Sequence, residues 1–230
     1  MSRLVVVTGG TRGIGAAVAR RFTDRGDRVV PLGRADCDVT DETAVAEVFG
    51  ALGEVDVLVN NAGVSSSAPL GKTSVADWQA QLDVNATGAF LCTRAVLPGM
   101  LARDHGRIVT VASTAGRAGQ AYTVAYSASK HAVVGLTRAV AAEVTGTGVT
   151  ANAVCPAFVR TDMTAKNVRR IAEITGRSTE DSERVITSLS PLGRLLEPDE
   201  VAFAVEFLAA REAAAINGQS IVLDGGGIQA

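Results

Sequence analysis

Short runs of β-branched residues alternate along the chain with longer stretches whose apolar positions recur at helical spacing. The short runs predict six strands, at residues 4–8, 28–32, 55–60, 107–112, 150–155 and 220–223. Strands joined by connections long enough for a helix form a parallel sheet with helices on both faces. The apolar run Val5-Val6-Val7 agrees, because both faces of such a sheet are buried. The pattern therefore predicts an α/β fold with a doubly wound parallel sheet, the Rossmann fold in three layers.

One polar and charged segment, residues 158–196, interrupts this rhythm before the last strand. Helical spacing recurs within it near 164–175 and 179–188. The segment follows the strand 150–155, and open α/β sheets bind ligands beyond the carboxyl ends of their strands. We expect residues 1–230 to form a single domain in which this segment acts as a substrate lid.

The charge is nearly balanced, with 22 basic and 24 acidic residues and a formal net charge of -2. No long block of one sign occurs, so we expect neither nucleic acid nor a membrane surface as a partner.

The first apolar run is too short for a signal peptide. Three widely separated cysteines favour free thiols in a reducing compartment, so the expected location is cytoplasmic. The two histidines lack a second ligand at metal spacing, and no metal site is predicted.

A glycine-rich turn joins the first strand to the helical stretch 16–25. Gly9 permits a tight turn, Gly13 lets the backbone approach a pyrophosphate, and Gly15 lets the helix pack closely on the sheet. The helix N-terminus would then face the anion. The turn predicts a dinucleotide site, and a tight turn without a ligand remains the alternative.

The end of the second strand bears on the choice of coenzyme. It reads Leu32-Gly33-Arg34, with no carboxylate to bind the adenosine ribose hydroxyls. Arg34 and Arg12, which lies in the glycine turn, could form a guanidinium fork for a 2′-phosphate. The alternative is that both arginines are merely solvated. We predict a preference for NADP(H), with NAD(H) left possible as the coenzyme.

A phenol and an ammonium group lie one helical turn apart. Tyr126 and Lys130 occupy positions i and i+4 of a helix-like run that extends to Val144. A phenol has an ordinary pKa of about 10, and a neighbouring ammonium would lower that pKa toward the range of proton transfer. Ser113 follows the strand 107–112, where its hydroxyl could hydrogen-bond a substrate carbonyl. Each feature alone suggests a capping hydroxyl or a surface pair, but together with the glycine turn they favour chemistry.

With these motifs the sequence resembles the short-chain dehydrogenase/reductase family over almost its whole length. The motifs that carry the resemblance are residues 8–15, Asn60-Asn61-Ala62-Gly63, Asn85, Ser113, residues 126–130, residues 152–161 and Asp224-Gly225-Gly226. The resemblance implies an NADP(H)-dependent oxidoreductase that interconverts a ketone and a secondary alcohol by hydride transfer. Tyr126 would be its general acid/base.

The resemblance also implies roles for individual residues. Ser113 would polarise the carbonyl, and Asn85 would anchor a water relay. Lys130 would hold the nicotinamide ribose and depress the pKa of Tyr126. The remaining residues assigned to the cofactor are Gly9, Thr11, Arg12, Gly13, Ile14, Gly15 and Arg34 at the phosphates, Asp38 and Val39 at the adenine, Asn61, Ala62 and Gly63 beside the adenosine ribose, and Pro156, Val159 and Thr161 at the nicotinamide amide.

Two departures from the family pattern are visible. The family places a helix and a further strand between Arg34 and Asp38, but residues 35–37 are too short for that crossover. We expect this helix to be missing and the sheet edge to be reduced or lost. The family's glycine after the proline is Ala157 here, where a left-handed backbone would be strained. The hinge of the lid is expected to differ accordingly.

Two regions of the chain bear on the substrate. Residues 190–201 and 218–219 resemble members that reduce 3-oxoacyl thioesters or polyketide chains, which are carrier- or CoA-bound. Lys166, Arg169 and Arg170 could contact such a carrier, although a solvated helix face is the simpler interpretation. The length of residues 158–196 instead resembles NAD(P)-dependent secondary-alcohol and hydroxyacid dehydrogenases.

Three further expectations complete the interpretation. A non-catalytic nucleotide-sensing protein is a minor alternative. Residues 127–130 also match the Ser-x-x-Lys nucleophile motif, but the companion motifs of acyl-serine enzymes are absent. The family commonly forms homotetramers, which implies that the helices around 78–100 and 126–144 pack across subunits.

Overall fold

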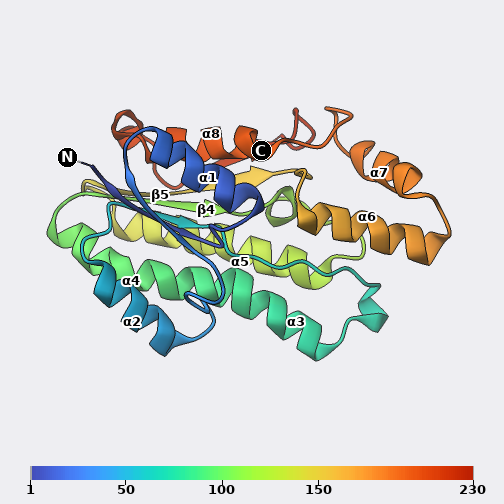
Figure 1. Cartoon of the computed structure of the whole chain (residues 1–230), viewed down its shortest axis with the longest axis horizontal. Coiled ribbons are helices and arrows are strands. Elements are labelled where there is room, and N and C mark those ends of the chain that lie inside the picture. Colours follow the sequence, from blue (N-terminus) through green and yellow to red (C-terminus); the bar gives the residue numbers. More distant parts are fainter. Residues whose placement is uncertain (1, 230) are drawn as a thin grey trace.

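The computed structural model describes residues 2–229 and contains one six-stranded sheet covered by helices on both faces (Figure 1). The strands are β1 (Leu4–Thr8), β2 (Arg28–Leu32), β3 (Val57–Asn60), β4 (Gly106–Val111), β5 (Val149–Pro156) and β6 (Ser220–Leu223). They lie in the order β2-β1-β3-β4-β5-β6, and all neighbouring pairs are parallel. Each agrees with a predicted strand to within two residues at either end, so the prediction of a doubly wound Rossmann fold is confirmed.

Helices α1 and α8 pack together on one face of the sheet, whereas α2, α4 and α5 lie on the other (Figure 1). The helices are α1 (Gly13–Asp24), α2 (Glu42–Leu52), α3 (Val75–Leu82), α4 (Gly88–Ala102), α5 (Val124–Glu143), α6 (Asp162–Thr175), α7 (Thr179–Thr187) and α8 (Pro198–Ala209). Alternation of side chains along the strands produces two cores. Val5 and Val7 join Phe22 of α1 in one core, whereas Leu4 and Val6 lie in the other with Phe49 of α2.

Strand β2 forms the edge of the sheet and pairs only with β1. Pro31 lies within it and has no N–H to donate, which suits an edge strand. Between β2 and α2 the described chain contains turns and no further helix or strand, so the expected loss of the family's extra helix and edge strand is confirmed. The carbonyl oxygen of Gly33 accepts hydrogen bonds from the N–H groups of Asp36 and Cys37, each at 3.1 Å.

The helical run that leads into α4 is not regular. A π-helical turn at Asp83–Thr87 interrupts this run and separates α3 from α4. Such turns insert one extra residue and often occur at functional sites. Here the turn carries Asn85, whose side chain is buried.

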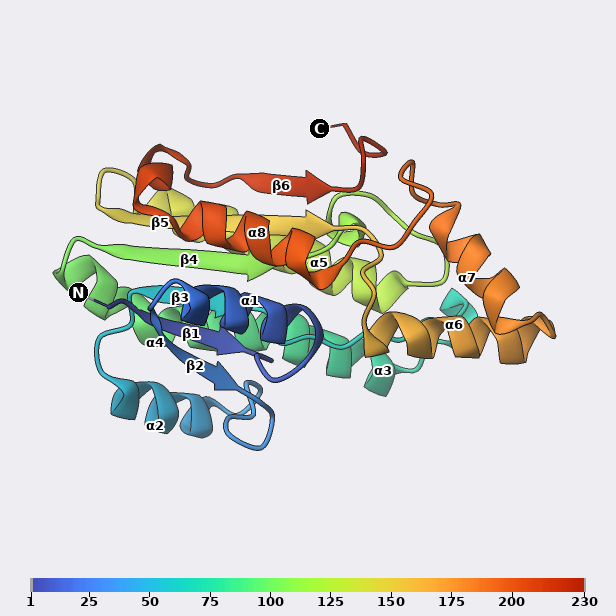
Figure 2. The same cartoon turned by 45° about the horizontal axis from the view of Figure 1, so that its top comes forward.

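Helices α6 and α7 lie beyond the carboxyl ends of the strands (Figure 2). They enclose a small hydrophobic cluster of their own, formed by Val168, Ile186 and Leu195. Among the described residues, the non-glycine residues with positive φ are Asp104 and Tyr122. Ala157 therefore avoids the left-handed region, and the strain considered at this hinge does not arise.

Candidate active site

The order of the strands reverses beside β1, because the chain continues to β2 on one side and later to β3 on the other. Open α/β sheets bind ligands in the crevice at such a point. The turns after β1 and β3 meet there. Asn61 Nδ2 donates hydrogen bonds to the carbonyls of Thr8 at 2.9 Å and Gly9 at 3.0 Å. Thr8 Oγ1 in return accepts from the N–H groups of Asn61 and Ala62, both at 3.1 Å.

Lack of space requires glycine at three positions of this turn, Gly9, Gly10 and Gly15. A Cβ atom on Gly15 would lie 2.2 Å from the carbonyl oxygen of Gly9. A Cβ atom on Gly9, which has φ of 62°, would lie 2.9 Å from Ala62 Cα. Both neighbours are backbone atoms and cannot rotate away. The turn is therefore held against the loop after β3, with Thr11, Arg12 and Ile14 between its glycines.

The N-terminus of α1 is suited to bind an anion. Four other helices have a side chain that accepts from their first N–H groups: Asp41 for α2, Ser74 for α3, Thr161 for α6 and Ser178 for α7. At α1 the N-cap residue Arg12 forms no such bond, and the first turn contains no acidic residue. The free N–H groups and the helix dipole fit the pyrophosphate of a dinucleotide.

The two arginines predicted to form a fork do not form one in this structure. Arg34 is 90% exposed at its side chain, and its Nε lies 3.3 Å from Asp38 Oδ2. Hydrogen bonds from Thr40 and the nearby Arg34 lower the pKa of Asp38 below its ordinary value. Arg12 is exposed. Both guanidinium groups remain accessible, so binding of a 2′-phosphate by them stays a prediction.

The residues predicted to contact the adenine and the nicotinamide differ in burial and position. Val39 is buried in the core, where a Cβ atom on Gly88 would lie 2.7 Å from its Cγ2. The side chain of Val159 is also buried in the core, and its contact with the nicotinamide amide stays a prediction. Thr161 does reach the glycine turn, since a Cβ atom on Gly13 would lie 3.3 Å from Thr161 Cγ2. Pro156 ends β5, at the edge of the sheet where the crevice opens.

Tyr126 lies on α5, and Ser113 is the N-cap of a short helical turn that follows β4. Burial raises the pKa of Tyr126 above its ordinary value, although a hydrogen bond with Ser113 acts in the opposite direction. The predicted lowering of this pKa by Lys130 is therefore wrong for the protein without a ligand. Desolvation of the phenolate is the larger effect, and Lys130, whose Nζ lies 5.8 Å from the ring centroid, does not offset it.

Lys130 is a buried cation with an incomplete set of partners. Burial lowers its pKa from the ordinary 10.5 to about 8. An ammonium has three donors, and the described residues supply one acceptor, the carbonyl oxygen of Val111 at 2.9 Å. Two N–H groups thus remain for a ligand. A pair of ribose hydroxyls has the chemistry to accept them, so the residues present fit a nicotinamide dinucleotide.

Asn85 connects the loop after β3 to α5. Its Oδ1 accepts from the N–H of Val64 at 2.8 Å, and its Nδ2 donates to the carbonyl of Val64 at 2.9 Å and to Ser129 Oγ at 2.9 Å. A Cβ atom on Gly63 would lie 3.2 Å from Asn85 Oδ1 and 3.7 Å from Lys130 Nζ. Gly63, Asn85 and Lys130 therefore meet at one place. No sequence motif pointed to Ser129 as the partner of Asn85.

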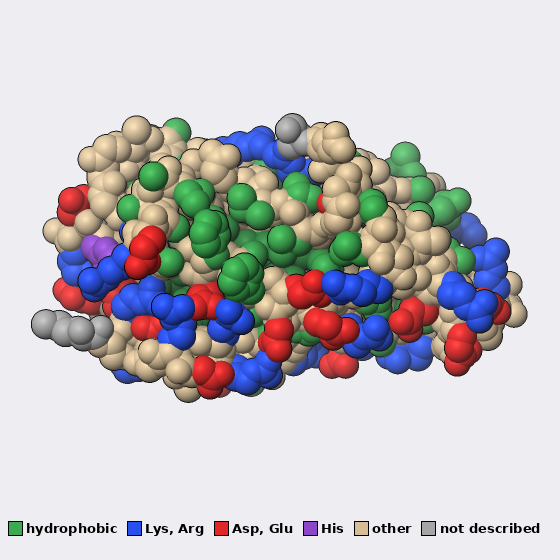
Figure 3. Space-filling model, turned by 90° about the horizontal axis from the view of Figure 1, so that it is seen from above, with side chains coloured by type: hydrophobic (Ala, Val, Ile, Leu, Met, Phe, Trp, Pro, Cys, Tyr) green, Lys and Arg blue, Asp and Glu red, His purple; other side chains and the backbone are tan. Residues whose placement is uncertain are grey.

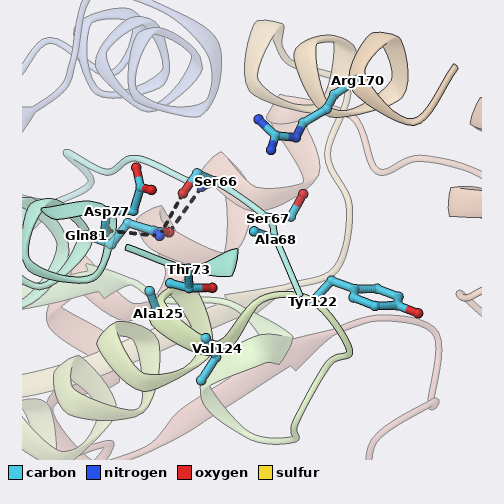
Figure 4. A pocket seen from close by; sticks show the side chains of 10 residues that line it. All are labelled: Ser66, Ser67, Ala68, Thr73, Asp77, Gln81, Tyr122, Val124, Ala125 and Arg170. Atoms are coloured by element: carbon cyan, nitrogen blue, oxygen red, sulfur yellow. Dashed lines mark hydrogen bonds between the residues drawn. The ribbon is translucent and has the colours of Figure 1, made fainter. Parts of the chain in front are cut away.

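A polar pocket opens beside Ala125, the residue that precedes Tyr126 in the chain (Figure 4). Its lining residues are Ser66, Ser67, Ala68, Thr73, Asp77, Gln81, Tyr122, Val124, Ala125 and Arg170. Tyr122 is 67% exposed and has φ of 66°, a conformation that costs roughly 1–3 kcal/mol in a residue with a Cβ atom. Its carbonyl accepts from the N–H of Ala68 at 2.8 Å, which ties the two sides of the pocket together. Nothing in the local sequence around Tyr122 indicates this strain, because the contact with Ala68 joins segments that are far apart in the chain.

Residues 2–229 contain no group of three or more His, Cys, Asp or Glu side chains arranged to hold a metal ion. Nor does any helix in this range have the length and apolar character needed to span a bilayer.

Comparison with known proteins agrees with this geometry. The family model for enoyl-(acyl carrier protein) reductase matches residues 31–227. The chain is 39% identical to the acetoacetyl-CoA reductase of Shinella zoogloeoides, covering 98% of both chains. It is 37% identical to a 3-oxoacyl-[acyl-carrier-protein] reductase of Synechocystis, covering 98% of this chain and 96% of that one.

This chain is also similar to a solved structure. The crystal structure of a variant of actinorhodin polyketide ketoreductase with NADPH has a TM-score of 0.90 and 36% sequence identity, and the match covers 98% of this chain and 97% of that one. Sequence, fold and the arrangement of Ser113, Tyr126 and Lys130 thus lead to one assignment. The chain is an oxidoreductase that belongs to the short-chain dehydrogenase/reductase family.

Proposed function

We propose that this protein is an NADP(H)-dependent ketoreductase that reduces the ketone of a 3-oxoacyl thioester, or of a related carbonyl compound, to a secondary alcohol. The observation that carries the proposal is the half-buried Tyr126 on α5, whose pKa the side chain of Ser113 acts to lower and which lies one helical turn from Lys130. The names of the relatives, which reduce acetoacetyl-CoA and 3-oxoacyl carrier-protein substrates, support the substrate class.

The mechanism follows from the protonation states of the site. Burial raises the pKa of Tyr126, so the phenol is protonated near neutral pH, as a general acid must be. A carbonyl oxygen between the hydroxyls of Ser113 and Tyr126 would accept from both, which stabilises the negative charge that develops there. NADPH, when bound, supplies the hydride to the carbonyl carbon.

Two residues would act beside this pair. Lys130 would hold the nicotinamide ribose with its two free N–H groups. Both N–H groups of Asn85 are already used, and one lone pair of its Oδ1 is left for a water molecule. We assign Asn85 to that water and to the placement of the loop that contains Gly63.

The coenzyme preference rests on chemistry near the glycine turn. Arg12 and Arg34 are both accessible, and a planar guanidinium suits a phosphate well. The related ketoreductase structure contains NADPH. We therefore assign NADP(H) as the preferred coenzyme, with NAD(H) accepted less well.

The alternative is a secondary-alcohol or hydroxyacid dehydrogenase. The polar pocket beside Ala125, with hydroxyl groups and the guanidinium of Arg170 around it, would also suit a small hydroxylated substrate. A nucleotide sensor is disfavoured, because the four residues to which we assign the chemistry, Asn85, Ser113, Tyr126 and Lys130, are all present. Reduction of a C=C bond is the activity that the name of the family model suggests, and an enoyl thioester tests it.

The proposed function is tested by coenzyme oxidation in the presence of a short 3-oxoacyl thioester. We expect turnover of acetoacetyl-CoA to 3-hydroxybutyryl-CoA, faster with NADPH than with NADH. A cyclic ketone and the enoyl thioester crotonyl-CoA are the controls, measured at the same concentration. Turnover of the ketone alone would support the alcohol dehydrogenase, and turnover of crotonyl-CoA alone would contradict the ketoreductase.

The carrier and the compartment belong to the same proposal. Arg170 extends from α6 over the polar pocket (Figure 4), whereas Arg169 lines a second cavity between α6 and α7 with Glu183. We propose that α6 and α7 form the lid and that their basic residues contact a carrier-bound substrate.

The three cysteines are buried as free thiols, which supports a reducing location such as the cytoplasm.

We propose a homotetramer, with two observations in support. Hydrophobic side chains gather on the face that carries α8, where Phe203 is 59% and Phe207 49% exposed (Figure 3). Small residues are exposed at helical spacing along α5, at Ala132, Gly135, Ala139 and Ala142, which permits a second helix to approach closely. Light scattering at micromolar concentration is expected to give four times the chain mass of 23.6 kDa. A monomer mass would overturn the assembly while leaving the chemistry intact.

A further inference from the structure

The short connection after β2 brings the carboxylate of Asp36 to the end of that strand, where the sequence itself has no acidic residue. In dinucleotide-binding folds, an acidic residue at the end of the second strand binds the adenosine ribose hydroxyls. Gly33 occupies that position here and has no side chain that could bind a ribose hydroxyl. The chain then folds back, and Asp36 Oδ2 accepts a hydrogen bond from the N–H of Gly33 at 2.8 Å.

The carboxylate of Asp36 takes the space that a side chain on Gly33 would fill. A Cβ atom on Gly33 would lie 3.2 Å from Asp36 Oδ2 and 3.3 Å from Thr11 Oγ1. Thr11 belongs to the glycine turn, beside Arg12. The carboxylate of Asp36 therefore lies next to the glycine turn at the end of β2, although Asp36 is three residues further along the chain.

The position of Asp36 is held by the backbone. The N–H groups of Asp36 and Cys37 both donate to the carbonyl of Gly33, which closes a tight turn around the carboxylate. The turn can form because no helix and strand intervene before α2. Arg34, the nearest cation in the sequence, lies against Asp38 rather than Asp36, and its side chain stays 90% exposed.

We propose that Asp36 is a coenzyme-selecting residue, which binds a ribose hydroxyl of the adenosine half and opposes a 2′-phosphate at the same place. This inference rests on the proposed dinucleotide-dependent function. Like charges placed side by side are costly, whereas a carboxylate and a hydroxyl form a strong hydrogen bond. Arg12 and Arg34 attract the 2′-phosphate and Asp36 repels it, so the chain retains NADH as a usable coenzyme.

The test is the binding of two adenosine nucleotides that carry no nicotinamide. Adenosine 2′,5′-bisphosphate presents the 2′-phosphate, and 5′-AMP presents the free hydroxyls. In the Asp36→Asn variant, the amide oxygen can still accept from Gly33 and preserve the turn. We expect calorimetry to show an increase of about tenfold in the affinity ratio of bisphosphate to AMP, which corresponds to about 1.4 kcal/mol. The ratio of kcat/KM for NADPH over NADH is expected to rise in the same direction.

A charge-matched control separates contact from general electrostatics. Glu42→Gln removes one negative charge from the same edge of the protein, but Glu42 pairs with Arg94 and faces α4. It is expected to leave the affinity ratio unchanged. An unchanged ratio in Asp36→Asn, or an equal rise in Glu42→Gln, overturns the assignment of Asp36 alone. If the unaltered protein binds neither nucleotide, the proposed function fails together with it.

Discussion

Replacing Tyr126 with phenylalanine is expected to lower kcat for ketone reduction by roughly 100- to 10,000-fold, the usual contribution of a positioned general acid. The substitution removes only the hydroxyl group. The ring keeps its place on α5, so nucleotide affinity and thermal stability are expected to change little. Steady-state kinetics and NADPH titration of the same preparation measure the two effects separately.

Ser113→Ala is the matched comparison for this variant. It leaves Tyr126 as the proton donor but removes one of the two hydroxyls that would bind the carbonyl oxygen, so a smaller loss in kcat is expected. Full activity of Tyr126→Phe would refute the assignment of the general acid and would favour the sensor interpretation. Loss of nucleotide binding in Tyr126→Phe would instead show a structural role.

Lys130→Met is expected to abolish most activity and, near neutral pH, to stabilise the protein without ligand. The pKa of Lys130 is about 8 in the folded chain and near the ordinary 10.5 in the unfolded chain. Below pH 8 both forms are protonated, and burial of the ammonium costs about 3 kcal/mol by the conversion of a pKa difference into free energy. Methionine has a similar shape and no charge, so this cost disappears.

The stabilisation by Lys130→Met is expected to decrease as pH rises. Between the two pKa values the unfolded chain binds more protons than the folded chain, so the free energy of unfolding of the unaltered protein rises with pH in that window. The advantage of Lys130→Met is therefore expected to be largest below pH 8 and to vanish as pH approaches 10.5. Denaturant unfolding at several pH values measures it. A destabilised variant at pH 7 would indicate that the hydrogen bond to Val111 outweighs the desolvation of the ammonium.

A buried, partly unsatisfied lysine is a typical cost of function. Natural proteins sacrifice stability where an active site needs a strained or desolvated group. Tyr122, with its left-handed backbone at the mouth of the polar pocket, is a second residue of this kind. Both lie near the place where Tyr126 acts, whereas the sheet below them is formed by well-packed valines.

The local pattern predicted the sheet well because each strand is a short run of β-branched residues bounded by turn-forming or polar residues. The absence of the edge strand was also predictable, since it depends on chain length: residues 35–37 cannot span a crossover. The glycine turn and the pair Tyr126 and Lys130 were recognisable for the same reason, because their geometry is set by neighbours within one turn.

Contacts between distant segments were not predictable in this way. The π-helical turn at Asn85 depends on Val64 and Ser129, which belong to other elements. The raised pKa of Tyr126 reflects burial by the whole fold, and a neighbouring lysine in the sequence suggested the opposite direction.

The sequence by itself determined the Rossmann fold, the family and the identity of the groups at the chemical centre, because these depend on periodicity and short-range spacing. Only the tertiary structure decided in which direction the pKa values of Tyr126 and Lys130 shift and which carboxylate lies beside Gly33. Desolvation and the closure of a loop bring together atoms whose separation along the chain says nothing of their distance in space. For Asp36, the hydrogen bond to the N–H of Gly33 was the deciding contact.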